Sequence, residues 1–204
     1  MIARARSARG EGVALRDEIL DAAEQLLLVH GHPEGVGMRA VAKAVGVTAP
    51  SIYRHFEDKD ALLFEVCARR FADLDAALVA AVAGVDDPVD ALEALGRAYV
   101  AFGLERQEAY KVLFGEKVAV PEGTMIEDLA GTRAFGRLAH VIQAGIDQGH
   151  FVTGDAWETA VAVWAAMHGL VLVIASTPDW FPLPPREASV ERTLRLVMEG
   201  ILAR

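Results

Sequence analysis

The sequence predicts an all-α protein, with an N-terminal three-helix helix-turn-helix head, a C-terminal helical bundle and about nine helices in total. Two observations lead to this class. Apolar residues recur at helical spacing through most of the 204 residues, and the two-residue alternation of half-buried strands is nearly absent. With 53% hydrophobic residues the chain is too apolar to be intrinsically disordered. Its length suffices for a packed core.

The first helix is expected over residues 14–30. One stripe at helical spacing is apolar: Leu15, Ile19, Ala22, Ala23, Leu26 and Leu27. The other face is acidic, with Asp17, Glu18, Asp21 and Glu24. Gly31 ends the helix, because glycine readily adopts the left-handed conformation that closes helices.

Residues 38–56 predict two short helices, over 38–45 and 49–56, joined by a glycine turn. Gly46 suits a turn position with positive φ, and Thr48 suits the N-cap of the second helix. Pro50 falls in the first turn, where its missing N–H costs little. Ile52 and Phe56 are four residues apart and should point inward. A polar and aromatic face is left outward: Ala49, Pro50, Ser51, Tyr53, Arg54 and His55.

A longer helix is expected from residue 58 or 59 to about 82. The sequence Gly84-Val85-Asp86-Asp87-Pro88 then marks the clearest domain boundary. Five further helices are expected, over residues 88–104, 106–115, 127–148, 155–176 and 187–203.

The charge of −9 is unevenly distributed. Residues 1–70 hold 10 basic and 10 acidic side chains, whereas residues 71–204 hold 10 basic and 19 acidic ones. A neutral head on an acidic body favours a polyanionic partner at the N-terminal end, with chance variation of surface charge as the alternative.

Other function classes find little support. Cys67 is the single cysteine, which excludes an internal disulfide framework and suits a reducing compartment. Residues 1–12 carry arginines without a following apolar stretch, and the uncharged run Ala160–Ala175 is shorter than a membrane span of ~20 residues. A soluble cytoplasmic protein is therefore expected. Without a phosphate-binding glycine loop or a nucleophile elbow, no enzyme activity or cofactor is expected. No metal site is expected either, because His30 and His32 lack acidic or cysteine partners at helical spacing.

Residues 14–64 resemble the TetR family of transcription regulators. The resemblance rests on Arg16–Ala23, Gly31, Arg39–Ala42, Gly46-Val47-Thr48, Tyr53-Arg54-His55-Phe56 and Lys59-Asp60-Ala61-Leu62-Leu63. It implies double-stranded DNA with a pseudo-palindromic operator as the partner. The implied DNA contacts are Arg39, Thr48, Ala49, Pro50, Ser51, Tyr53, His55 and Lys59. Ala49 and Pro50 would meet base edges, and Lys59 would hold a phosphate together with helix N-terminal amides. Arg4, Arg6 and Arg9 could enter a minor groove.

The C-terminal part, with Trp164 and His168-Gly169, resembles a TetR subgroup that carries a Trp-x-x-x-His-Gly signature. The resemblance implies a flexible basic arm (1–12), a DNA-binding domain (13–58), a connecting helix (59–83) and a ligand-binding and dimerisation domain (84–204). It further implies a homodimer through helices near 155–176 and 187–203. The candidate ligand contacts are Phe102, Tyr110, Phe114, Met125, Phe135, Trp164, Met167 and His168, with ordinary core packing as the alternative.

The expected function is thus a homodimeric repressor that a mostly apolar small molecule releases from DNA. The alternative is a ligand-independent dimeric DNA-binding protein whose C-terminal domain only dimerises. The two differ in whether the C-terminal domain binds a ligand.

Overall fold

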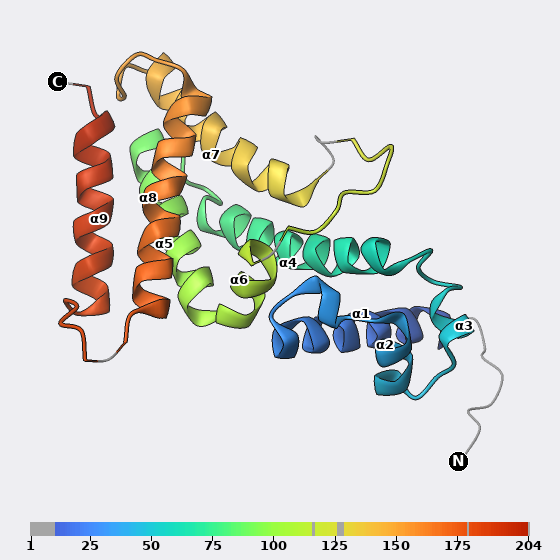
Figure 1. Cartoon of the computed structure of the whole chain (residues 1–204). Coiled ribbons are helices and arrows are strands. Elements are labelled where there is room, and N and C mark those ends of the chain that lie inside the picture. Colours follow the sequence, from blue (N-terminus) through green and yellow to red (C-terminus); the bar gives the residue numbers. More distant parts are fainter. Residues whose placement is uncertain (1–10, 116, 126–128, 179, 204) are drawn as a thin grey trace. The chain divides into compact units, whose positions relative to one another are not determined.

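The computed structural model describes residues 11–115, 117–125, 129–178 and 180–203 (Figure 1). Over these residues it is all-helical and contains no strand, which confirms the predicted fold class. The α-helices are α1 Glu11–His30, α2 Met38–Val45, α3 Ala49–Ile52, α4 Lys59–Ala81, α5 Pro88–Glu105, α6 Gln107–Phe114, α7 Ala130–Asp147, α8 Ala156–Ser176 and α9 Arg186–Ile201. A short 3-10 helix, η1, spans Pro33–Gly35.

Two helices differ clearly from the sequence expectation. Helix α1 begins at Glu11, so the last two residues of the expected arm are helical. The arm arginines lie outside the described residues. Helix α3 ends at Ile52 rather than at residue 56, because the backbone tightens there and the His55 N–H donates to the Ile52 carbonyl three residues back. Ile52 and Phe56 are nevertheless both buried, as predicted.

The chain divides into two compact units. The first takes the chain up to Arg70 together with Lys111–Thr124, and the second comprises Phe71–Tyr110 and Met125–Arg204. Two of the three boundaries fall inside α4 and α6, and the third falls between α6 and α7. The division into arm, DNA-binding domain, connecting helix and C-terminal domain stays a prediction, since it was drawn by function rather than by contacts.

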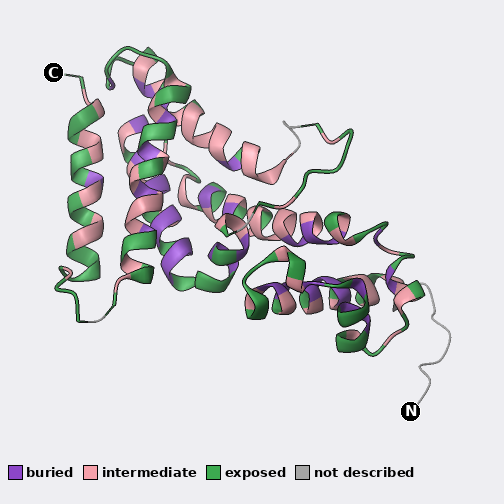
Figure 2. Ribbon diagram, in the orientation of Figure 1, coloured by how far each residue is buried: buried purple, intermediate pink, exposed green. Residues whose placement is uncertain are grey.

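In the first unit, α1, α2, α3 and the start of α4 share one core. Ile19, Val41, Ile52 and Leu62 are completely buried in it (Figure 2). Helices α1 and α2 make one of the more extensive contacts of the unit. Small side chains on α2 let the two helices cross closely. This core holds the four-residue α3 in place, because so short a helix has no stability of its own.

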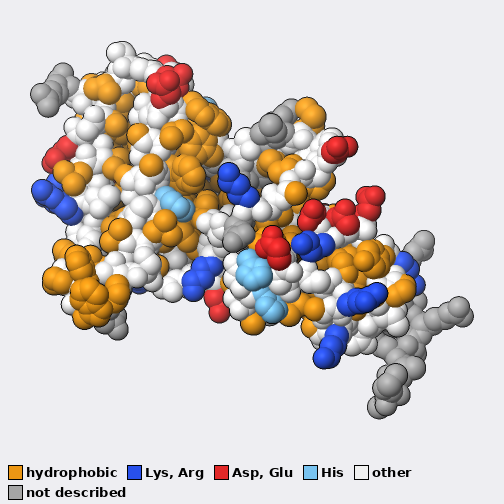
Figure 3. Space-filling view, viewed as in Figure 1, with side chains coloured by type: hydrophobic (Ala, Val, Ile, Leu, Met, Phe, Trp, Pro, Cys, Tyr) orange, Lys and Arg blue, Asp and Glu red, His pale blue; other side chains and the backbone are white. Residues whose placement is uncertain are grey.

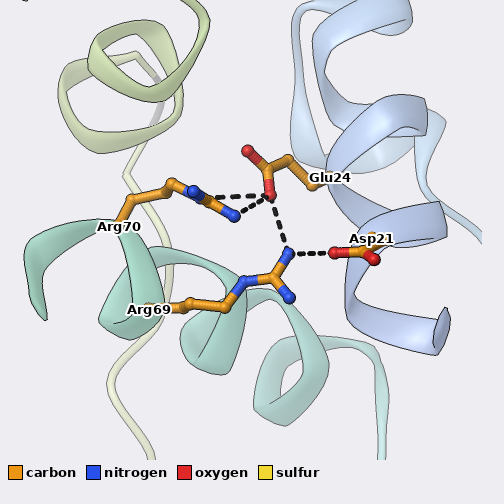
Figure 4. Close-up of polar contacts among 4 residues, drawn as sticks. All are labelled: Asp21, Glu24, Arg69 and Arg70. Atoms are coloured by element: carbon orange, nitrogen blue, oxygen red, sulfur yellow. Dashed lines mark hydrogen bonds and ion pairs between the residues drawn. The ribbon is translucent and has the colours of Figure 1, made fainter. Parts of the chain in front are cut away.

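A charged cluster joins α1 to α4 within the same unit (Figure 4). The Glu24 carboxylate accepts hydrogen bonds from Arg69 Nη2 at 3.0 Å and Arg70 Nε at 3.1 Å. Arg69 also donates to Asp21 at 2.6 Å. Glu24 is only 8% exposed. The sequence placed Glu24 on the face of α1 opposite the apolar stripe, and this residue is nevertheless buried because α4 covers that part of α1.

In the second unit, α5, α7, α8 and α9 pack on one another around a core that contains Leu92, Ile142, Phe151 and Val163. A Cβ atom on Gly145 of α7 would lie 2.1 Å from the Phe151 ring, so glycine permits this close approach. The first turns of α5 and α8 are capped by aspartates at positions 87 and 155, whose carboxylates accept backbone N–H bonds.

Helix α8 is more apolar than the sequence argument allowed. It has 21 residues, and its mean hydropathy of 1.9 makes it long and apolar enough to cross a membrane by those criteria alone. The uncharged run Ala160–Ala175 is part of this longer helix, which meets criteria of length and composition that the run alone does not meet. Only 22% of the apolar window is buried within the chain. Such a helix needs a partner surface to cover it.

Candidate functional site

The turn between α2 and α3 has the geometry that its sequence predicts. Gly46 takes the left-handed conformation with φ 79°, and the Val47 N–H donates to the Ala42 carbonyl at 2.9 Å. Pro50 lies in the first turn of α3. Ile52 anchors α3 in the core with no exposed surface. The outer side of α3 is thereby fixed toward solvent.

The structure presents the predicted DNA-contacting side chains on one part of the first unit: the start of α2, α3 and the start of α4. Four are exposed: Arg39, Thr48, Pro50 and Tyr53. Four are half-buried: Ala49, Ser51, His55 and Lys59. A tyrosine that keeps 53% of its surface exposed beside a buried core is ready for an outside partner.

Across α2, α3 and the turn between them the charged side chains are of one sign, whereas exposed Asp58 and Asp60 flank Lys59 at the start of α4. Residues 38–56 contain Arg39, Lys43 and Arg54 and no acidic residue. All three are exposed, and Figure 3 shows Lys and Arg side chains over α2. An acid-free basic surface around a short exposed helix suits a phosphate backbone.

Hydrogen bonds fix the polar side chains of α3 before any partner binds. Thr48 Oγ1 lies 3.0 Å from Ser51 Oγ, and Arg54 Nη2 donates to Ser51 Oγ at 3.3 Å. The Thr48 side chain therefore does not cap the helix, contrary to its expected local role. Arg54, left out of the predicted contacts, is exposed and held beside Ser51. Its basic side chain next to predicted contacts was the available signal.

The start of α4 is already occupied in part. Asp58 Oδ1 accepts a hydrogen bond from the Ala61 N–H at 2.8 Å. This carboxylate takes one of the amides that were expected to join Lys59 in holding a phosphate. Lys59 remains half-buried at the first position of the helix. A backbone hydrogen bond is the main cause that lowers the pKa of the Glu34 carboxyl; His32 and, least of all, the charge of Lys59 lower it further.

In the second unit, four aromatic side chains from three helices bring their polar atoms together. Tyr99 of α5 lies 3.1 Å from Tyr110 of α6, hydroxyl to hydroxyl. Both hydroxyls meet Nδ1 of His168 on α8, at 3.0 and 2.5 Å. The indole N–H of Trp164 donates to the Tyr99 hydroxyl at 3.0 Å. We call these four residues the aromatic cluster.

Burial keeps the aromatic cluster uncharged at neutral pH. Desolvation raises the pKa of the Tyr99 and Tyr110 hydroxyls above their ordinary value. The same effect lowers the pKa of His168, because an imidazolium loses hydration when it is buried. The cluster is thus a neutral polar site in an apolar surrounding.

The predicted ligand contacts fall into three groups. Tyr110, Trp164 and His168 meet in the aromatic cluster, and Phe135 lies edge-on to Trp164 with ring centroids 6.1 Å apart. Phe102 and Met167 are buried in the second unit. Met125 is exposed, and Phe114 belongs to the first unit.

Sequence reasoning missed Tyr99. A polar aromatic residue on the buried face of α5, eleven positions before Tyr110, was the available signal. Over the described part of the chain, no three His, Cys, Asp or Glu side chains are grouped as a metal site would require.

Two family models match this chain, one over each part of the sequence. Residues 19–66 match the family model described as bacterial regulatory proteins, tetR family. Residues 92–197 match the model of the tetracyclin repressor-like C-terminal domain. The second match alone covers more than half of the chain. The Trp-x-x-x-His-Gly subgroup stays a prediction.

Curated relatives match over a shorter stretch. Two uncharacterized HTH-type transcriptional regulators of Mycobacterium tuberculosis are 34% identical over 76 residues, which is 37% of this chain and 37% of each relative. The aligned part therefore spans well under two thirds of their length.

Solved structures match over nearly the whole chain. A protein of unknown function from Rhodococcus sp. RHA1 has a TM-score of 0.75 and 28% identity, and the match covers 93% of this chain and 96% of that one. A putative tetR family regulator from Shewanella sp. PV-4 has a TM-score of 0.76 and 18% identity over 93% and 99%. AibR, solved in complex with isovaleryl coenzyme A and operator DNA, has a TM-score of 0.70 and 18% identity over 89% and 97%. With both family models matched in order along the sequence, the chain belongs to the TetR family of bacterial regulatory proteins.

Proposed function

We propose that the chain is a sequence-specific DNA-binding transcription regulator, a homodimeric repressor in the cytoplasm that a mostly apolar small molecule releases from its operator. The observation that carries the proposal is the acid-free surface of α2 and α3, with Tyr53 half exposed and Arg39 exposed at the start of α2. The family to which the chain belongs is described as bacterial regulatory proteins, which supports the proposed regulatory function.

The DNA-contacting side chains divide by chemistry. Tyr53, Lys59 and Arg39 are suited to phosphates, which fix position and carry no sequence information. Ala49 and Pro50 have no polar side-chain atoms, so they discriminate bases through apolar contact, for which the thymine methyl group is the partner. Ser51 is held by Thr48 and Arg54 and supports this surface.

A second copy of the chain is the proposed cover for α8. Its exposed stripe is apolar or small: Val161, Ala162, Ala165, Leu172 and Val173. A Cβ atom on Gly169, within that stripe, would meet nothing within 4 Å, so another helix has room to approach there. The stripe leads to the α8–α9 loop, where Trp180 is 80% exposed and hydrophobic side chains gather (Figure 3). Two-fold pairing through this surface supplies the two heads that a pseudo-palindromic operator requires.

The aromatic cluster is the proposed centre of the ligand site. Its rings come from α5, α6 and α8, with Phe135 of α7 against Trp164, so a ligand there touches most of the bundle. AibR shows that a protein of this fold accommodates both a ligand and operator DNA. Release follows if the ligand prefers a bundle conformation in which the paired heads do not match the operator.

A mobility-shift assay on DNA upstream of the gene, beside random DNA at the same salt, tests DNA binding. Lys59→Ala and Tyr53→Phe should each weaken binding to every sequence, by about tenfold for loss of a charged phosphate contact. Lys117→Ala is the charge-matched control, since that exposed lysine lies outside the proposed surface. Equal affinity for both DNAs, or unchanged binding by both variants, would contradict the assignment.

Light scattering tests the dimer. Leu172→Glu puts a charge on the exposed stripe of α8 and should shift the mass from dimer to monomer. Val29→Glu is the control, because Val29 is 78% exposed on α1 in the other unit and should leave the mass unchanged. A Leu172→Glu protein that stays dimeric would place the interface elsewhere.

A further inference from the structure

Arg54 is exposed just past the end of α3, and a hydrogen bond holds its guanidinium beside that helix. Arg54 Nη2 donates to Ser51 Oγ at 3.3 Å, and the Ser51 hydroxyl lies 3.0 Å from Thr48 Oγ1. Ser51 belongs to the four-residue helix, and Thr48 directly precedes it. The long Arg54 side chain therefore runs back along α3 instead of extending away from its end.

The place of Arg54 in the chain directs it away from the core. It comes two residues after Ile52 and two before Phe56, and both of these residues are buried. The N–H groups of His55 and Phe56 donate to the Ile52 carbonyl, so the backbone keeps turning as a helix here. Side chains two residues apart in a helix differ by about 200° in direction. Arg54 is thus nearly opposite both buried anchors, on the line of the helix that faces base edges when such a helix enters the major groove.

The charge of the Arg54 guanidinium is available to a partner. Over the described part of the chain, Arg54 has Ser51 as its hydrogen-bond partner and forms no ion pair with a carboxylate. Glu57 and Asp58 are the acidic residues closest in sequence, and the Asp58 carboxylate accepts from the Ala61 N–H. Ser51 occupies one N–H of the guanidinium and leaves the others open. The planar fork can still donate two parallel hydrogen bonds.

The first residues of α3 leave a gap in base recognition that this fork fills. Ala49 and Pro50 have no polar side-chain atoms, so they recognise the thymine methyl group and cannot identify guanine. Guanine presents two neighbouring acceptors in the major groove, O6 and N7, whose spacing matches an arginine fork. A guanidinium that Ser51 already holds in place loses less conformational freedom when it binds.

We propose that Arg54 reads one guanine in each half of the operator by donating two hydrogen bonds from its guanidinium to guanine O6 and N7. Ser51 and Thr48 act as positioning residues, since they hold the guanidinium beside α3 before DNA binds. The proposal rests on the proposed function and specifies a base that this function reads.

The test begins with the unaltered full chain, which selects binding sites from a pool of random DNA duplexes. The enriched sequence should carry a guanine in each half-site whose change to adenine lowers affinity at least about tenfold. In synthetic duplexes, 7-deazaguanine at this position of one half-site removes N7 and should lower affinity about tenfold. Hypoxanthine is the matched control, because it keeps O6 and N7 and lacks only the minor-groove amino group. It should lower affinity less than about threefold.

Arg54→Ala should reduce the preference for guanine over adenine to below about threefold and should abolish the effect of 7-deazaguanine. The side chain is exposed and forms no ion pair among the described residues, so the variant should show the circular dichroism spectrum of its parent. Lys43→Ala is the charge-matched control, since Lys43 is exposed on α2. This variant should weaken binding to all sequences alike and keep the guanine preference.

Ser51→Ala separates positioning from reading. It keeps the guanidinium and removes the hydroxyl that holds it, so the guanine preference should fall by about threefold without disappearing. A full preference in this variant would overturn the role given to Ser51.

Several outcomes overturn the proposal alone: an enriched sequence without a guanine in each half-site, a guanine preference that survives in Arg54→Ala, or a 7-deazaguanine effect that persists in that variant. An equal loss of affinity on every sequence would make Arg54 a phosphate contact and overturn it as well. A failure of the proposed function is a different result, because the unaltered chain then enriches no sequence at all, and the reading by Arg54 falls with it.

Discussion

Replacing Glu24 with Gln tests how strongly the charged cluster fixes α1 to α4. The substitution keeps the size of the side chain and removes the charge that faces Arg69 and Arg70. The Glu24 side chain is 10% exposed, but the two arginines are 26% and 23% exposed, so water screens the pairs in part. Breaking a buried pair costs about 3–5 kcal/mol and an exposed one less than about 1 kcal/mol, so we expect about 2 kcal/mol here.

Asp21→Asn is the matched control, because Asp21 binds the same Arg69 guanidinium at 2.6 Å with 68% of its side chain exposed. We expect a loss of about 0.5 kcal/mol or less for this variant. The measurement is thermal unfolding at fixed protein concentration, where the Glu24 variant should melt about 4–8 °C below the parent protein. High salt should erase the Asp21 effect and leave most of the Glu24 effect.

Equal losses for the two variants would refute the reasoning, since exposure is the main difference between the two carboxylates. A Glu24→Gln protein as stable as its parent would refute it as well. Either result would mean that the apolar contacts of the first unit, rather than the charged cluster, hold α1 against α4.

Three further predictions concern other buried groups. Burial raises the pKa of Cys67 to about 11 from 9.0, so its thiol at pH 8 should react with iodoacetamide about 100-fold more slowly than free cysteine. Gly145→Ala should destabilise the protein by more than about 1 kcal/mol in urea unfolding, because the new Cβ would collide with Phe151, whereas Gly136→Ala on the same helix meets nothing and should stabilise it by about 0.5 kcal/mol. In the folded protein the pKa of His168 lies below its ordinary 6.5, so as the pH falls the unfolded chain binds this proton before the folded protein does. The contribution of His168 to stability is therefore constant above pH 6.5 and becomes destabilising below it. Proton NMR should give a His168 midpoint below 6.5, and a midpoint above 6.5 would contradict this.

The sequence was informative about the DNA-binding head because its signals are local. A glycine with positive φ, a proline in a first turn and two apolar residues four apart specify the turn between α2 and α3 almost alone. Gly46, Pro50, Ile52 and Phe56 all behave as their sequence context predicts. The end of α3 was predicted too late, since helical propensity does not show where the backbone tightens.

The apolar composition of α8 was equally clear from the sequence, but the sequence did not show which surface covers this helix. Periodicity identified a helix, and only the fold shows that the described residues leave its apolar stripe exposed. Whether an apolar helix becomes core, membrane span or interface depends on what packs against it, and no local pattern encodes that.

By itself, the sequence determined the helices, the turn of the head and the family. The tertiary structure alone decided the surroundings of Glu24 and Tyr99. Glu24 is buried because arginines 45 and 46 residues away reach it, and Tyr99 joins His168 across 69 residues. Burial and hydrogen bonding between residues so far apart depend on how helices pack, whereas helix formation depends on neighbours within a few residues.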